Sequence, residues 1–317
     1  MKYNKILIIG EAGYIGSHVT HELCDQGYNV TVLDNLSTGF IDNIDKRSDF
    51  IEDSFINLSD NVLKNIDCVI HLAALKAAGE SMENPIKYSE LNIINSIKLI
   101  NLCVKNNIKN FVFSSSAAVY GFPKYLPIDE KHPLNPINYY GFTKLIIEKQ
   151  LLWYNQLKGL NVACLRYFNA AGYDVKGRIK NKENEPQNLL PVVMEVAAGL
   201  REKINVFGND YDTPDGTCLR DYIHVNDLAI GHVKAIEMLP DNGKITTNLA
   251  TGNSYSVLDV INKSSQITNK EIKYSIVDRR EGDPDKLFAS SNGTLNYSNK
   301  YSDLETIINS MWKIYKD

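Results

Sequence analysis

The sequence predicts an α/β fold in which a Rossmann-type, doubly wound parallel sheet is followed by a smaller C-terminal α/β lobe. Through the first half of the 317 residues, short β-branched apolar runs alternate with longer amphipathic stretches, which is the pattern of βαβ units. The short runs are almost continuously apolar, as expected for strands covered by helices on both faces. After Asn169 the sequence becomes more polar and less periodic. We therefore expect one domain over 1–170 and a second over 171–317, with the chain crossing back between the lobes around 220–250.

The expected elements follow from the spacing of apolar residues. Strands are expected at 5–9, 29–33, 68–72, 110–114 and 162–166 in the first domain, and at 204–207, 246–249 and 272–277 in the smaller lobe. Helices are expected after the glycine-rich turn at 10–16, at 85–106 and 140–157, and at 190–200, 225–238 and 257–265 in the smaller lobe. Residues 174–188 have little periodicity and are expected to form a surface loop.

The composition excludes several classes of function. A formal net charge of -4 leaves no basic footprint for nucleic acid or for an anionic membrane surface. The five cysteines are dispersed without a CxxC pair, which predicts reduced thiols and no metal site. No apolar run is long enough to span a bilayer, and the N-terminus enters a strand without the pattern of a signal peptide. We therefore expect a cytoplasmic protein that binds neither nucleic acid nor a membrane.

The first expected strand ends in Gly10-Glu11-Ala12-Gly13-Tyr14-Ile15-Gly16. Glycines at such a strand-to-helix turn let the backbone approach a pyrophosphate, which the helix N-terminus then binds. The spacing is G-x-x-G-x-x-G rather than G-x-G-x-x-G, and an ordinary glycine-rich turn is the alternative. Asp34 ends the next strand about 20 residues later, where an acid accepts hydrogen bonds from a ribose and repels a 2′-phosphate. Together these features favour NAD, although Asp34 in isolation could also cap a helix.

A tyrosine and a lysine stand four residues apart in Tyr140-Gly141-Phe142-Thr143-Lys144, on one face of an expected helix. A neighbouring ammonium favours the phenolate, so Tyr140 could act as a general base near neutral pH. Upstream, the strand at 110–114 runs into Ser114, Ser115 and Ser116, whose hydroxyls would lie at the ligand-binding edge of the sheet. A surface Tyr–Lys pair and a serine-rich cap are the alternatives.

The chain resembles the extended short-chain dehydrogenase/reductase family. The glycine-rich loop, the serines at the end of a strand and the Tyr-x-x-x-Lys motif occur here in the order found in that family. The resemblance implies that Ser116, Tyr140 and Lys144 form the catalytic triad. Tyr139 and Tyr120 are competing tyrosines, but neither stands four residues before a lysine.

Within that family the chain is most similar to the UDP-glucose (UDP-galactose) 4-epimerases. The segments that carry the resemblance keep their order along almost the whole chain: 13–18, 33–36, 71–76, 114–121, Leu165-Arg166-Tyr167-Phe168-Asn169, 207–211, 219–225 and 279–283.

The resemblance implies two sets of ligand residues and an NAD-binding first domain with a UDP-sugar-binding second lobe. The cofactor set is Gly10, Gly13, Tyr14, Ile15, Gly16, Asp34, Asn35, Ser37, Thr38, Gly39, Leu72, Ala73, Ala74, Lys76, Asn92, Ser114, Tyr140, Lys144, Tyr167 and Phe168. The substrate set is Lys76, Ser116, Tyr140, Asn169, Asn188, Leu189, Val206, Phe207, Arg220, Tyr222, Arg280, Asp283 and Leu287. A homodimer, in which the helices at 85–106 and 140–157 pack against a second copy, is also implied.

The implied reaction is inversion at C4 of UDP-glucose and UDP-galactose by transient oxidation with bound NAD+. UDP-GlcNAc and UDP-GalNAc are expected as further substrates, since Leu287 stands where a bulky tyrosine excludes N-acetyl groups. Ala117-Ala118 occupies the place of the acidic pair found in dehydratases, so dehydration is not expected. The alternatives are a UDP-uronate epimerase or decarboxylase and a non-catalytic NAD-binding sensor.

Three positions depart from the usual epimerase pattern: Glu11 after the first glycine, Ser54 in place of an adenine-binding aspartate, and Ala118 in place of a threonine. A carboxylate at position 11, beside a pyrophosphate, would be unfavourable unless it points outward. Asp53 could substitute for the missing aspartate by a shift of one residue.

Overall fold

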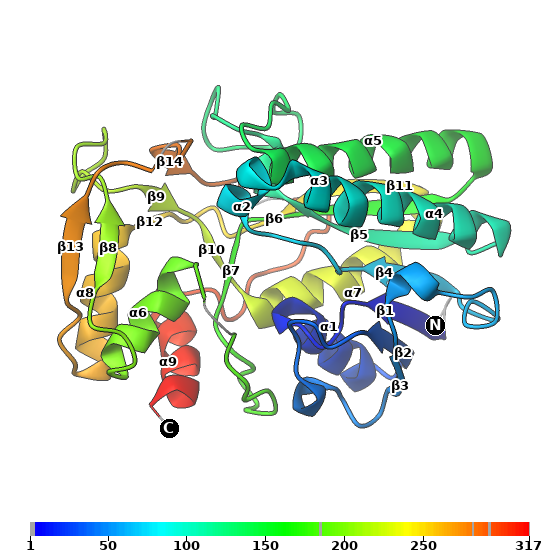
Figure 1. Ribbon diagram of the computed structural model, residues 1–317, viewed down its shortest axis with the longest axis horizontal. Helices are drawn as coiled ribbons and strands as arrows, with labels where there is room; N and C mark the ends of the chain where they lie inside the picture. The colour runs from blue at the N-terminus through cyan, green and yellow to red at the C-terminus, as the bar shows by residue number, and fades with distance from the viewer. Residues whose placement is uncertain (1–3, 184–185, 281, 291–292, 317) are drawn as a thin grey trace.

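The computed structural model describes residues 4–183, 186–280, 282–290 and 293–316, and it confirms the predicted fold class (Figure 1). A seven-stranded sheet has the order β11-β6-β5-β4-β1-β2-β3, and all its neighbouring strands are parallel. The strands are β1 (Lys5–Ile9), β2 (Asn29–Asp34), β3 (Asp49–Glu52), β4 (Cys68–His71), β5 (Asn110–Ser116), β6 (Asn161–Tyr167) and β11 (Lys244–Leu249).

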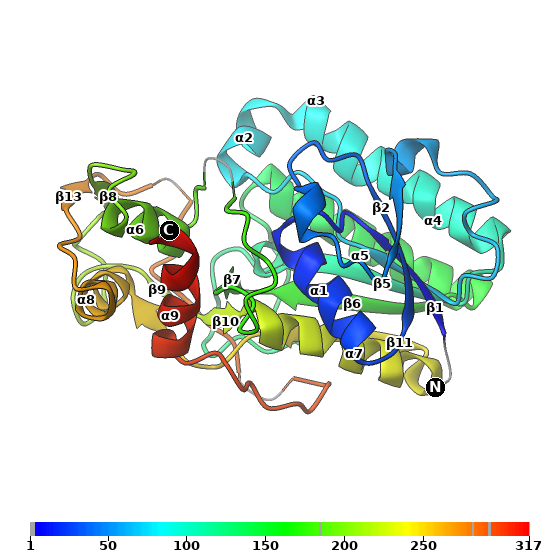
Figure 2. The ribbon, with the colours of Figure 1, turned by 90° about the horizontal axis from the view of Figure 1, so that it is seen from below.

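Helices cover both faces of this sheet (Figures 1 and 2). On β1 (Lys5–Ile9), Ile6 and Ile8 pack with α1 (Tyr14–Asp25) and α7 (Val225–Asn242). Leu7 and Ile9 point the opposite way and pack with α4 (Ser96–Lys105) and α5 (Tyr139–Lys158). Because successive side chains of a strand alternate between faces, the unbroken apolar run supplies both layers of the core.

The helix expected at 85–106 is built from three consecutive pieces. It starts with α3 (Pro85–Tyr88), continues through a π-helical stretch (Ser89–Asn95) and ends with α4. A shorter helix, α2 (Ala78–Glu83), precedes it. Short 3₁₀ turns lie at Ile41–Asn43, Phe55–Asn57 and Ala117–Val119.

The described part of the second lobe, on the left of Figure 1, consists of helices and several short strands. The helices are α6 (Leu189–Ala197), α8 (Val257–Thr268) and α9 (Leu304–Tyr315), of which α9 was not predicted. The strands pair as β8 (Ile204–Phe207) with β13 (Tyr274–Val277), β9 (Leu219–Arg220) with β12 (Tyr255–Ser256) and β14 (Lys286–Leu287), and β7 (Asn169–Ala171) with β10 (Tyr222–His224).

The helix at 225–238 and the strand at 246–249, expected among the elements after residue 170, lie with the first lobe, and they fall in the range 220–250 where a return of the chain to that lobe was expected. β11 pairs with β6 along its whole length, from Lys244 opposite Val162 to Leu249 opposite Tyr167. α7 packs against α1 in the first lobe. Periodicity identifies an element but not the sheet that it joins, because sheet membership depends on contacts far apart in the sequence.

The carboxyl ends of β1, β4, β5 and β6 lie at one edge of the sheet. The chain runs outward from β1 to β3 and then crosses to β4 on the other side of β1. Such a reversal leaves a crevice beyond the strand ends, where ligands of open α/β sheets bind. The β7–β10 pair lies between this edge and the second lobe (Figure 1). Among the described residues, no helix is long and apolar enough to cross a membrane.

Candidate active site

The three glycines of the first turn have different surroundings. Gly10 has a φ of +87°, and a Cβ there would lie 2.5 Å from the Ala73 nitrogen. A Cβ on Gly16 would lie 2.4 Å from the Gly10 oxygen, whereas one on Gly13 would come no nearer than 3.7 Å to any described atom outside its chain neighbours. Gly10 and Gly16 are therefore required by packing, while Gly13 leaves the N-terminus of α1 open to a ligand. An anion placed there would meet free backbone N–H groups.

Asp34 connects the end of β2 to the glycine turn. Its carboxylate accepts hydrogen bonds from the Ala12 N–H at 3.0 Å and the Leu36 N–H at 2.8 Å. Each oxygen keeps a second lone pair, so the group can still accept hydroxyl donors from a ribose. Gly39 packs on the same turn, because a Cβ there would lie 2.5 Å from the Ala12 carbonyl carbon. The structure thus joins two predicted cofactor segments into one surface, with Asn35, Ser37 and Thr38 exposed beside it.

Tyr140 and Lys144 lie one turn apart on α5. The Lys144 Nζ is 5.8 Å from the centre of the Tyr140 ring and donates to the Ser114 carbonyl at 2.8 Å. Ser116, at the end of β5, hydrogen-bonds the Tyr140 phenol. The structure therefore brings Ser116, Tyr140 and Lys144 together at the carboxyl edge of the sheet.

Burial dominates the electrostatics of this trio. It lowers the pKa of Lys144 to about 7. It also raises the pKa of the Tyr140 phenol, and the hydrogen bond from Ser116 opposes that rise. The phenol pKa is therefore shifted up and not down as expected, because burial disfavours the charged form of both groups. A positive charge beside the phenol would lower its pKa again.

The two competing tyrosines are engaged elsewhere. The Tyr139 hydroxyl shares a hydrogen bond of 2.5 Å with Ser89. The Tyr120 hydroxyl donates to Asn248 at 2.6 Å and accepts from Arg166 at 2.9 Å. Neither is free to act as a base at the sheet edge.

Residues of the predicted substrate set converge on the second lobe. An Arg220 amino nitrogen lies 3.6 Å from a carboxylate oxygen of Asp283. The Arg280 guanidinium lies over the Phe207 ring, 4.3 Å from its centre. Neither contact uses up the guanidinium donors, and a pair of guanidinium groups suits the oxygens of a diphosphate. Glu281, between Arg280 and Asp283 in the same motif, lies outside the described residues.

Several predicted ligand residues also have structural contacts. Val206 is 1% exposed in the core of the second lobe, so its side chain supports β8. The Tyr14 hydroxyl donates to the Gly172 carbonyl at 2.5 Å, and its ring packs on the same core. The Asn92 amide binds the Leu75 N–H and carbonyl, both at 2.9 Å, and so fixes the loop that follows β4.

The other predicted residues lie around the same edge. Lys76 is exposed and forms an ion pair with Glu183 of the loop that was expected at 174–188. The Tyr167 hydroxyl hydrogen-bonds His232 at 2.6 Å. The remaining residues of the two predicted sets lie at or near the ends of strands and helices. Phe168 and Tyr222 are buried, and the others are at least partly exposed: Ile15, Leu72, Ala73, Ala74, Asn169, Asn188, Leu189 and Leu287.

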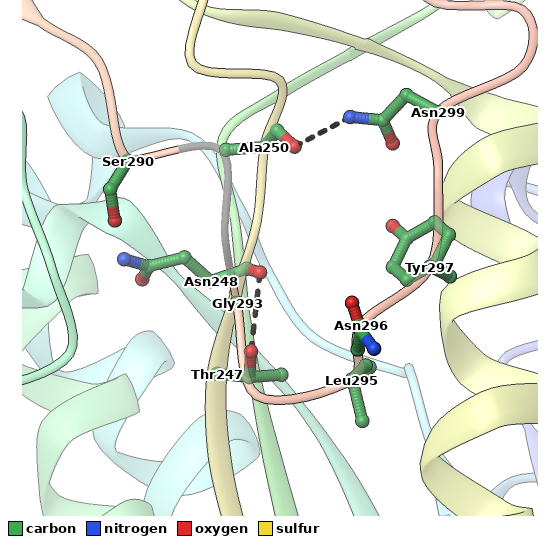
Figure 3. A pocket seen from close by; sticks show the side chains of 9 residues that line it. All are labelled: Thr247, Asn248, Ala250, Ser290, Gly293, Leu295, Asn296, Tyr297 and Asn299. Carbon is green, nitrogen blue, oxygen red and sulfur yellow. Dashed lines mark hydrogen bonds between the residues drawn. The ribbon is translucent and has the colours of Figure 1, made fainter.

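One small cavity of the described residues lies at the flank of this edge, beyond the end of β11. Figure 3 shows this cavity between the end of β11 and residues 293–299, with Ser290 beside it and a lining mostly of amides and hydroxyls. Its volume is about 30 Å³. That volume is on the order of one water molecule, so the cavity is too small for a nucleotide. The described residues contain no cluster of three or more His, Cys, Asp or Glu that could hold a metal ion.

Sequence reasoning did not identify Glu148 and Arg166 as a pair. Both are buried, and Arg166 donates to the Glu148 carboxylate from two nitrogens at 2.9 and 2.7 Å. The available signal was an acid four residues after Lys144, on the same face of α5 as Tyr140 and Lys144.

Comparison with known proteins gives a consistent result. The model of the NAD dependent epimerase/dehydratase family matches residues 6–250. The UDP-glucose 4-epimerase of Halalkalibacterium halodurans is 43% identical over 324 residues, covering 98% of this chain and 96% of that protein. The structure of UDP-glucose 4-epimerase from Brucella ovis in complex with NAD has a TM-score of 0.93 and 40% identity, covering 99% and 98% of the two chains. The enzyme from Bifidobacterium longum in complex with NAD+ and UDP has a TM-score of 0.92 and 36% identity, covering 98% of each chain.

Glu11 is buried and does not point outward, so the unfavourable charge beside the glycine turn must be avoided in another way. Its side chain is 0% exposed and lies near Thr20, Asp34 and Asp45. Within the described part of the chain, neither carboxylate oxygen makes a hydrogen bond of good geometry. Burial, followed by the charge of Asp34, raises its pKa from 4.5 to about 8. The carboxyl is therefore protonated at neutral pH and places no charge beside the glycine turn.

This raised pKa predicts a pH-dependent stability. The folded state binds a proton that the unfolded chain releases above pH 4.5, so the contribution of Glu11 is largest at low pH and is lost as pH rises to about 8. The full effect is on the order of 5 kcal/mol, at about 1.4 kcal/mol per pH unit. Urea unfolding with saturating NAD at pH 5, 6.5 and 8 should show Glu11→Gln gaining stability over the natural protein as pH rises.

The control is Glu52→Gln, an exposed position at the end of β3. Its stability should follow that of the natural protein at each pH. Parallel curves for Glu11→Gln and the natural protein would contradict the buried, protonated state.

Proposed function

This chain belongs to the NAD-dependent epimerase/dehydratase family, and on that premise we propose that it is a UDP-glucose 4-epimerase that interconverts UDP-glucose and UDP-galactose with bound NAD. The observation that carries the proposal is the position of Ser116, Tyr140 and Lys144. They lie at the sheet edge shared with the glycine turn, and the guanidinium groups of Arg220 and Arg280 come from the lobe beyond it.

The residues at the edge fit a dinucleotide. Gly13 leaves room for the pyrophosphate at the start of α1, and the Asp34 carboxylate has lone pairs for the ribose hydroxyls. Bound there, the nicotinamide would supply the hydride acceptor in its oxidised form and the hydride donor in its reduced form, so that the cofactor need not leave between cycles.

The triad moves the proton of the C4 hydroxyl. Tyr140 acts as the general base in the oxidation and as the general acid when the hydroxyl is restored. Ser116 hydrogen-bonds the substrate oxygen and the phenol, and so orients the transfer. Lys144 lies within range to stabilise the phenolate by its charge.

UDP would be anchored away from the reacting carbon. In this proposal Arg220 and Arg280 bind the diphosphate, and Asn169, Tyr222 and Asp283 hold the rest of the nucleotide. The cofactor belongs to the lobe of 1–170, completed by α7 and β11, and the UDP-sugar to the rest of 171–317. Binding of the remote UDP group retains the substrate while its C4 centre is oxidised. A cytoplasmic location is supported by five free thiols, since disulfides are typical of oxidising compartments.

The proposal extends to UDP-GlcNAc and UDP-GalNAc through Leu287. This residue lies opposite Arg220 in the β9–β14 pair and packs on the cluster that contains Ala117 and Phe168, beside Ser116. It therefore stands between the proposed diphosphate anchors and the catalytic trio. A leucine leaves more room there than a tyrosine would.

We also propose a homodimer formed through α5 and the helix before it. On α5, Phe142, Trp153 and Leu157 are 41%, 57% and 66% exposed, and their spacing of eleven and four residues puts them on one face of the helix. Ile86, on the neighbouring α3, is 74% exposed. A symmetric contact of this face with its copy would bury these side chains in a four-helix arrangement.

The reaction is tested by incubating the pure protein with UDP-galactose and no added oxidant or reductant. NMR should show UDP-glucose, whereas a decarboxylase or uronate epimerase would leave UDP-galactose unchanged. Tyr140→Phe should lower kcat by about 1000-fold, within the range for loss of a general acid–base group, with little change in bound NAD. Tyr139→Phe is the matched control and should keep most of the activity. Full activity in Tyr140→Phe would favour a sensor or a different base.

The substrate range is tested with Leu287→Tyr. The natural protein should epimerise UDP-GalNAc as well as UDP-galactose. The variant should lose turnover of the N-acetyl substrate by at least about 10-fold, within the range for contacts that define a pocket, while UDP-galactose turnover changes little. Leu287→Ile is the control that keeps the size. Unchanged UDP-GalNAc turnover in the tyrosine variant would refute the role of Leu287.

The dimer is tested by sedimentation of the NAD-loaded protein over a range of concentrations. The natural protein should sediment as a dimer, and Trp153→Glu should shift it to monomer. Tyr274→Glu alters an apolar residue of similar exposure, 45%, on β13 in the other lobe and should stay dimeric. A monomer at every concentration of natural protein would rule out the interface.

A further inference from the structure

A buried ion pair lies directly behind the catalytic trio. Glu148 and Arg166 are 3% and 4% exposed. Arg166 donates to both carboxylate oxygens, from Nε at 2.9 Å and from an amino nitrogen at 2.7 Å. The Ser115 hydroxyl donates to the same carboxylate. The carboxylate is thus bound from two neighbouring strands, since Ser115 on β5 is paired with Arg166 on β6.

This pair touches the elements of the trio on two sides. Tyr140, Lys144 and Glu148 follow one another at intervals of four residues on α5, so the Glu148 carboxylate lies one turn beyond the lysine. On β5, Ser115 stands between Ser114, whose carbonyl accepts from Lys144, and Ser116, which hydrogen-bonds Tyr140. A shift of Glu148 would move both the helix and the strand end.

Arg166 has further partners that hold it in place. It donates to the Tyr120 hydroxyl at 2.9 Å, and that hydroxyl donates to Asn248 of β11 at 2.6 Å. Its guanidinium lies 5.0 Å from the centre of the Tyr120 ring. The network therefore ties α5, β5 and β6 to the strand that the second half of the chain contributes.

The histidine, phenols and thiol around the trio and the pair carry little charge at neutral pH, which leaves Glu130 as a further carboxylate among the described residues near Tyr120. Burial lowers the pKa of His71 to about 3 and raises the pKa of the nearby phenols and of the Cys164 thiol. The groups with shifted pKa values are His71 on β4, Tyr88 on α3, Tyr120, and Cys164 and Tyr167 on β6. The Glu130 carboxylate accepts a hydrogen bond from the Asn248 N–H. Glu148 and Arg166 are therefore the full charges one helical turn from Lys144.

An ion pair in this place has a specific consequence for the lysine. Among the described residues, Lys144 pairs with no carboxylate and donates to the Ser114 carbonyl. A carboxylate one turn away would attract the ammonium if it were unpaired. Because Arg166 binds both oxygens of Glu148, the charge of the carboxylate is largely cancelled at the lysine.

We propose that Glu148 and Arg166 are positioning residues for the C4 epimerisation. Glu148 fixes Ser115, and with it the Ser114 carbonyl and Ser116. Arg166 cancels the charge of Glu148, so that Lys144 acts on Tyr140 alone. The inference rests on the proposed function, because it assigns roles relative to the proposed base.

The charge role is tested by removing the cation alone and then both charges. Arg166→Met leaves an unpaired carboxylate, which favours the protonated phenol. The acidic limb of kcat/KM against pH for UDP-galactose should therefore move up by about one pH unit, as for a nearby like charge. KM should stay within about threefold, because the UDP contacts lie elsewhere. Glu148→Gln/Arg166→Met should return the limb to its natural position.

Arg166→Lys separates the positioning role from the charge role, because it keeps the positive charge but loses the bidentate geometry. Its acidic limb should stay in place while kcat falls by about 10-fold or more, the size expected when a proton donor is displaced. The pKa of the Tyr140 phenol can also be measured without turnover, by ultraviolet titration. The difference between each variant and the same variant carrying Tyr140→Phe isolates this phenol among the 18 tyrosines. The phenol pKa should shift in the same variants, and by the same amount, as the acidic limb.

Arg178→Met is the matched control. Arg178 pairs with the buried Asp174 at 2.8 Å, away from the trio. This variant should lose stability without moving the acidic limb. If Arg166→Met fails to fold, the double variant and Arg166→Lys still test the two roles.

Three results would overturn the inference. One is an unmoved acidic limb and phenol pKa in Arg166→Met, and another is an equal shift in Arg178→Met. The third is an acidic limb that is shifted in Glu148→Gln/Arg166→Met as much as in Arg166→Met. Absence of epimerisation by the natural protein would refute the proposed function instead, which separates the two failures.

Discussion

The site depends on an ammonium held out of water at the end of β5. Lys144 is 4% exposed, and its Nζ is enclosed by the Ser114 carbonyl, the Phe113 ring at 4.9 Å and the Tyr140 ring at 5.8 Å. Moving an ammonium into protein is unfavourable, and α5 achieves it because apolar residues such as Ile147 and Leu151 pack into the core beneath the sheet. The consequence is a pKa of about 7, which makes the charge beside Tyr140 responsive to whatever enters the site.

The same edge is rigidly connected to the lobe that would hold the nucleotide. Asp221, between Arg220 and Tyr222, is fully buried and accepts from the Thr251 N–H and hydroxyl and from the Gly252 N–H, at 2.7 to 2.9 Å. Thr251 follows β11, the edge strand of the large sheet. A substrate bound through Arg220 is therefore held in a fixed position relative to the sheet whose strand ends carry the catalytic groups. This explains why the chain returns to the first lobe before it completes the second.

Local patterns and long-range contacts differ in what the sequence reveals. The strands from β1 to β6 in the first sheet, except β3, were predictable because buried parallel strands are unbroken apolar runs. The approach of Lys144 to Tyr140 was predictable because helical spacing is local. The sheet joined by β11, the inward turn of Glu11 and the pairing of Arg166 with Glu148 were not, because each depends on residues distant in the sequence. Val206 shows a limit of assigning ligand residues from a family resemblance. A matching position in the sequence does not tell whether the side chain or the backbone faces a ligand.

Inversion at one carbon places opposite demands on a single site. The nucleotide must stay bound while the hexose turns its other face to the same base and hydride carrier. In the proposed arrangement, the charged groups lie at the nucleotide end, on Arg220, Arg280 and Asp283. The side chains between them and Ser116 are small or apolar, namely Ala117, Ala118 and Leu287. Such side chains cannot form directional hydrogen bonds with the sugar hydroxyls, so they do not favour one face of the ring. In the proposed arrangement, the alanine at position 118 is consistent with this requirement, because it offers the sugar no hydroxyl contact.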